Sequence, residues 1–141
     1  MTCFHTFPVP PERHPTAEAR ASLNVHLEFD DDNQIQDWER YFADETRIAE
    51  FLDLYFSGPL DADQRSLLMD LIIASTAFAE DGQVTVEQWS MIETALLANA
   101  DLHGRTVWEW ADIDEETGIS PNDFPISERM QDLWVKIANA G

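Results

Sequence analysis

Residues 62–79, ADQRSLLMDLIIASTAFA, form the most apolar helical stretch of the chain. The apolar side chains recur three and four positions apart and cover a wide face, which is typical of a helix buried on several sides. These side chains are Leu67, Leu68, Leu71, Ile72, Ala74 and Phe78. We therefore predict a helix over about 62–79 that forms the centre of the core.

Two polar pairs mark where helices begin. Asp61 stands three residues before Gln64, and Thr85 stands three residues before Gln88. In such a capping box the side chain of the first residue accepts a hydrogen bond from the backbone N–H of the residue three positions later. The side chain of that later residue accepts a hydrogen bond from the backbone N–H of the first. These pairs predict that one helix starts after Asp61 and another after Thr85, the latter running to about residue 99.

Further helices are indicated by the same apolar period. They are expected from Asp30 through Phe42, and at about 48–55, 104–112 and 130–137. Gly58, followed by Pro59, is expected to adopt the left-handed conformation that ends the helix before it. The predicted fold class is therefore mostly α, with about five helices around residues 62–79.

The N-terminal region is expected to differ from this pattern. Residues 1–16 contain four of the seven prolines, which predicts an extended arm over about 1–20. Residues 22–29, SLNVHLEF, alternate apolar and polar positions, which favours a short strand; a helix that begins near Thr16 is the competing interpretation. With 141 residues the chain is expected to form one domain, 1–141, with a folded body over 21–141.

The charge of the chain restricts the partners that it can bind. It has 28 Asp and Glu against 8 Lys and Arg, a formal net charge of −20, and Lys136 is its one lysine. Such a surface repels nucleic acid and anionic membranes and attracts basic proteins. Many of the acids fall in residues 28–53 and 109–116, where few bases accompany them. We expect these segments to present a negative face to a basic protein partner.

Aromatic residues near these acids are candidate anchors, because tryptophan is enriched in binding hot spots. Trp108 and Trp110 are two positions apart, so both cannot face inward on a helix with one buried stripe, and we expect at least one to be partly exposed, at an edge or an interface. The residues expected to bind the partner are Asp30, Asp31, Asp32, Asp37, Trp38, Glu39, Asp44, Glu45, Trp108, Glu109, Trp110, Asp112, Asp114, Glu115 and Glu116.

Residues 28–39, EFDDDNQIQDWE, have oxygen-bearing side chains near the spacing of an EF-hand loop. However, Asn33 stands where glycine is expected, and the preceding residues predict a strand rather than an entering helix. We therefore assign no metal site and no cofactor, and cation binding at 28–39 is left as an open alternative.

No catalytic motif is evident. His5, His14, His26 and His103 are scattered, and none has the spacing of a helix-borne metal site. The single Cys3 lies in the proline-rich terminus, and none of the five glycines cluster as a phosphate-binding loop requires. We predict that the protein is not an enzyme; a small enzyme would need a concave pocket lined by acids of raised pKa.

The segment AEDGQVTVE, residues 79–87, separates two predicted helices. Over residues 67–97 the chain resembles the helix–Asp-Gly–helix core of tellurite-resistance TerB-like domains, and Asp81, Gly82 and Glu87 are the matching residues. This resemblance implies an all-helical module that binds divalent cations. It predicts that micromolar calcium or magnesium raises the melting temperature.

The overall layout, a short N-terminal part followed by acidic, aromatic-rich helices, is similar to small immunity proteins of bacterial toxin systems. That resemblance implies an inhibitor that occludes a basic toxin or effector, most simply a nuclease. A nucleic-acid-mimicking inhibitor of phage origin is an alternative of the same physical class. Residues 1–20 show no signal-peptide pattern and no apolar run is long enough to span a membrane, so a cytoplasmic protein is expected.

Overall fold

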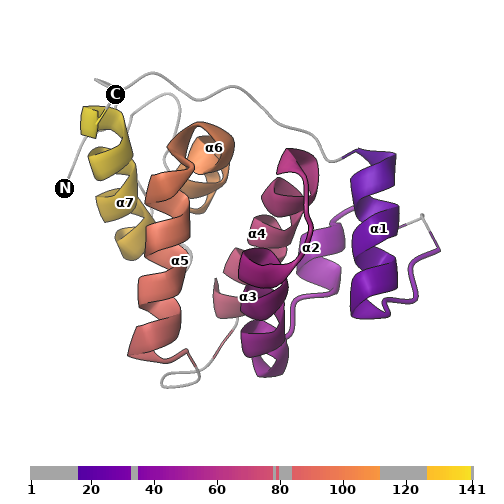
Figure 1. The fold of residues 1–141 in the computed structure, drawn as a ribbon. Coiled ribbons are helices and arrows are strands. Elements are labelled where there is room, and N and C mark those ends of the chain that lie inside the picture. The colour runs from indigo at the N-terminus through magenta and orange to yellow at the C-terminus, as the bar shows by residue number, and fades with distance from the viewer. Residues whose placement is uncertain (1–15, 33–34, 78, 80–83, 112–126, 141) are drawn as a thin grey trace. The chain divides into compact units, whose positions relative to one another are not determined.

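The computed structural model describes residues 16–32, 35–77, 79, 84–111 and 127–140, and within these ranges it contains helices and no strand (Figure 1). The helices are α1 (Ala17–Leu27), α2 (Trp38–Tyr41), the 3₁₀ turn η1 (Glu45–Arg47), α3 (Ile48–Ser57), α4 (Ala62–Ala77), α5 (Val86–Ala98), α6 (Ala100–Trp110) and α7 (Ser127–Ala140). The prediction of a mostly α fold is confirmed.

The chain divides into two compact units, one with the described residues of His14–Met91 and the other with those of Ile92–Gly141. The expectation of a single domain over 1–141 stays a prediction.

Helix α4 is the centre of the first unit, where it packs against α1, α2 and α3 (Figure 1). From Ser66 to Ala77 every side chain of α4 is buried except that of Asp70. A helix with neighbours on several sides must be apolar almost all round, which is why its sequence shows a wide apolar face rather than a narrow stripe. The predicted central helix is confirmed over Ala62–Ala77.

Both predicted capping boxes are present. The Gln64 backbone N–H donates to Asp61 Oδ1 and the Asp61 N–H donates to Gln64 Oε1, both at 2.8 Å. The Gln88 N–H donates to Thr85 Oγ1 at 3.0 Å, and the Thr85 N–H donates to Gln88 Oε1 at 2.9 Å. These bonds satisfy backbone donors that have no partner inside the helix, and so they fix where α4 and α5 begin.

Gly58 ends α3 in a different way from that predicted. Its backbone is extended, with φ −79° and ψ 153°, instead of left-handed. A Cβ at this position would lie 2.6 Å from the carbonyl oxygen of Leu54 and 2.7 Å from its Cδ1 atom. Glycine is therefore needed here for close approach to the preceding turn and not for an unusual φ.

The predicted strand at 22–29 is wrong, because Ala17–Leu27 form helix α1. Thr16 caps this helix by accepting a bond from the Ala19 N–H at 3.1 Å. Ala19, Leu23 and Leu27, four residues apart, are buried, whereas Val25 is 80% exposed. The alternation of apolar residues in the sequence thus combined two buried positions of one helical face, Leu23 and Leu27, with the exposed Val25 between them. Residues 17–20 of the predicted arm are thus helical, and residues 1–15 lie outside the described part.

The helical period that begins near Asp30 produces only one turn of helix, α2. Residues 30–32 and 35–37 are not helical. Asp31, Ile35 and Trp38 are instead hydrogen-bonded to side chains of α1.

The second unit contains α6 packed against α7, with Met130, Leu133 and Trp134 of α7 buried. Helix α6 begins at Ala100, four residues before the predicted start, which places the buried His103 inside the helix instead of at its end. Among all described residues, no helix is long and apolar enough to cross a membrane.

Candidate partner-binding surface

The tryptophans proposed as anchors are core residues in this structure. Trp38 is 2% exposed, and its ring lies in an aromatic cluster with Phe29 and Phe42. The Trp38 Nε1–H donates to Asn24 Oδ1 at 2.8 Å, which satisfies its polar atom within the protein. Its expected role as an exposed anchor is therefore corrected.

Trp108 and Trp110 are also buried, at 8% and 5% exposure, so the expectation that at least one is partly exposed is wrong. Helix α6 is buried over most of its circumference. The Arg105 guanidinium lies 4.6 Å from the centre of the Trp108 ring and donates to Glu109 at 2.9 Å. This cation covers the ring, and Glu109, itself exposed, is engaged in an ion pair.

Asp31 has a structural role that its place in an acidic run concealed. Its side chain is fully buried and accepts bonds from Arg20 Nη2 at 2.6 Å and Asn24 Nδ2 at 2.7 Å. Arg20 Nη2 also donates to the Ile35 carbonyl at 3.0 Å. The hydrogen bond to Asp31 raises the pKa of the Arg20 guanidinium. Together with the Trp38–Asn24 bond, this network holds Asp31, Ile35 and Trp38 against α1.

Arg47 forms a second fixed point, between α1 and α3. It donates to the Leu27 carbonyl at 2.9 Å and to both oxygens of Glu50, at 2.6 and 3.0 Å. Its guanidinium also lies over the rings of Phe29 and Phe51, at 5.2 and 5.3 Å. The hydrogen bond from Arg47 lowers the pKa of the Glu50 carboxyl group. The half-buried Arg20 and Arg47 thus hold together the elements on which the exposed acids of this unit lie.

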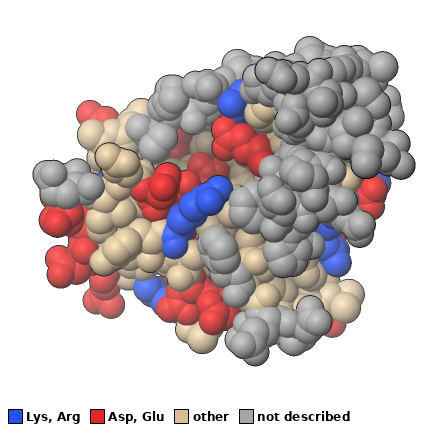
Figure 2. Space-filling view, turned by 180° about the vertical axis from the view of Figure 1, so that it is seen from behind, with Lys and Arg blue, Asp and Glu red and all other residues tan. Residues whose placement is uncertain are grey.

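The other predicted acids lie in three kinds of place. Asp30, Asp32 and Asp37 are exposed, and Asp30 and Asp37 make no ion pair. Glu39, Asp44 and Glu45 are half-buried, and Asp44 caps η1 by accepting from the Thr46 N–H at 2.9 Å. Asp112, Asp114, Glu115 and Glu116 lie outside the described residues. Figure 2 shows carboxylates (red) in several separate groups on one face, with individual cations (blue) lying among them.

Glu50 and Asp53 were not among the predicted binding residues, although they line a pocket of about 270 Å³ with His26, Leu27, Leu54, Ser57 and Gly58. Their spacing of three residues on α3 places them on one helix face, a signal that the sequence does contain. Their approach to the end of α1 depends on the tertiary structure, which the sequence pattern does not reveal.

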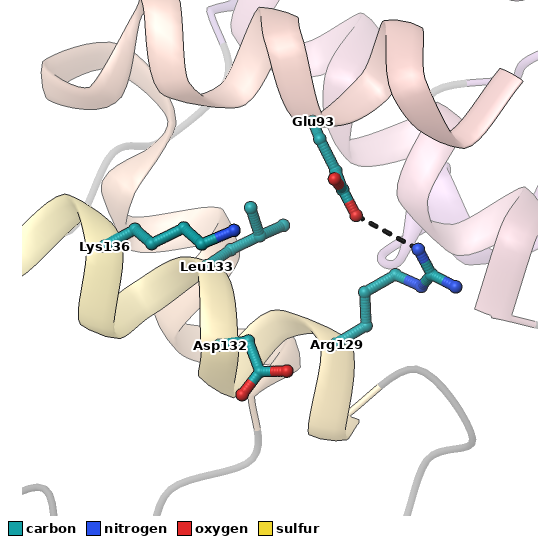
Figure 3. Close-up of a pocket in the computed structure, with 5 residues that line it drawn as sticks. All are labelled: Glu93, Arg129, Asp132, Leu133 and Lys136. Carbon is teal, nitrogen blue, oxygen red and sulfur yellow. Dashed lines mark hydrogen bonds and ion pairs between the residues drawn. The ribbon is translucent and has the colours of Figure 1, made fainter. Parts of the chain in front are cut away.

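A second pocket, of about 350 Å³, lies in the other unit between α5 and α7 (Figure 3). It is lined by Glu93, Arg129, Asp132, Leu133 and Lys136. Arg129 Nη1 donates to Glu93 at 3.0 Å, and the four charged residues balance in sign. This pocket therefore has no net preference for a cation or an anion.

The structure contains no group of three or more His, Cys, Asp or Glu side chains that could hold a metal ion, within the residues that it describes. In the EF-hand-like segment, Asn33 is outside those residues. Of the positions that resemble TerB-like domains, Asp81 and Gly82 are also outside them, and Glu87 is an exposed residue in the first turn of α5.

Comparison with known proteins yields no match: no family model fits the sequence, and no curated protein or solved structure is significantly similar to it.

Proposed function

We propose that this chain is a non-enzymatic, acidic binding protein that occludes a basic partner, as an immunity or inhibitor protein does with a nuclease toxin. One observation carries the proposal: several exposed carboxylates of the unit that contains α1 to α4 form no ion pair within the described part of the chain. These residues are Asp30, Asp37 and Asp53.

Unpaired surface carboxylates repel one another and so oppose folding. A basic partner would relieve this repulsion, and the negative field would speed their encounter. A nuclease is the simplest partner, because its active surface must be basic to bind phosphates, and carboxylates can occupy the same positions. A nucleic-acid mimic of phage origin would use the same contacts, and the identity of the captured partner distinguishes the two.

Affinity capture from the native host tests this proposal, with bound proteins identified by mass spectrometry at low and at moderate salt. Three baits are compared: the natural chain, an Asp30→Lys/Asp37→Lys variant and an Asp101→Lys/Asp132→Lys variant. Both variants change the net charge equally at exposed acids, but the second pair lies in the other unit. Asp31 is left unchanged because its carboxylate is buried in an ion pair.

We expect the natural chain and the Asp101/Asp132 variant to retain the same stoichiometric basic protein, and the Asp30/Asp37 variant to lose it. Equal loss from both variants would show that net charge alone mediates binding. Capture of no basic protein by any bait, from cells shown to express one, would contradict the proposal.

A further inference from the structure

We draw no further inference here: the strongest candidate, the open hollow beside α2 that is lined by Ile35, Gln36, Asp37, Arg40 and the exposed Tyr41, carries one acid and one base, and nothing in the structure shows what covers it.

Discussion

Asp30 and Asp31 are adjacent acids whose replacement by asparagine is predicted to have very different effects on stability. Asp31→Asn removes the charge that Arg20 contacts through Nε at 2.5 Å and Nη2 at 2.6 Å. The new amide also places a donor against Arg20 or Asn24, both of which donate to Asp31. Asp30→Asn removes an equal charge from an exposed carboxylate that forms no ion pair.

Breaking a fully buried ion pair costs about 3–5 kcal/mol. The Arg20 side chain is 19% exposed, so water can recover part of this cost, and we expect Asp31→Asn to lower the free energy of unfolding by about 2–3 kcal/mol. Asp30→Asn should be neutral or slightly stabilising, since it reduces repulsion in a chain of net charge −20. Urea unfolding followed by tryptophan fluorescence measures both, and a loss of about 2 kcal/mol lowers the midpoint by about 1 M. Equal midpoints for the two variants would refute the structural role of Asp31.

Three further predictions concern single residues. Arg47 lowers the pKa of Glu50 from 4.5, so the stabilising effect of this pair is present above pH 4.5 and is lost as the pH falls through the lowered pKa. The difference in urea midpoint between the natural chain and Glu50→Gln should therefore be small and should vanish in acid. A difference that grows in acid would contradict this prediction. Gly58→Ala should destabilise by about 1–3 kcal/mol, since its Cβ would meet the Leu54 carbonyl at 2.6 Å, and an unchanged melting temperature would count against this contact. Thr85→Ala should lower the free energy of unfolding by about 1 kcal/mol, measured by thermal melting, and Thr85→Ser should retain most of the stability of the natural chain. Equal melting temperatures for the alanine and serine variants would show that the cap bond contributes nothing.

Local signals in the sequence predicted much of the fold. The apolar face of 62–79 and the pairs Asp61/Gln64 and Thr85/Gln88 depend on residues within one or two turns, and all three predictions were confirmed. The helix at Ala17–Leu27 was only the competing interpretation, because Leu23 and Leu27 satisfy both a two-residue and a four-residue period. The Thr16 cap was the local signal that could have decided between them.

The candidate surface was less accessible to sequence analysis because it depends on contacts between distant residues. The burial of Trp38 depends on Asn24, and the burial of Asp31 depends on Arg20. Neither partner can be identified from an acidic run or from a helical period. The pocket that contains Asp53 exists only because the ends of α1 and α3 meet there. In contrast, the cover of Trp108 by Arg105, three residues away on one helix, was a local signal that could have been used.

The most direct test of the central claim is inhibition of the captured basic partner by the purified chain. The partner's nuclease activity is titrated with the natural chain and with the Asp30→Lys/Asp37→Lys variant at about 0.15 M salt. Our account predicts complete inhibition at an equimolar ratio by the natural chain and inhibition by the variant only at much higher concentration. Full nuclease activity in the presence of excess natural chain would contradict it.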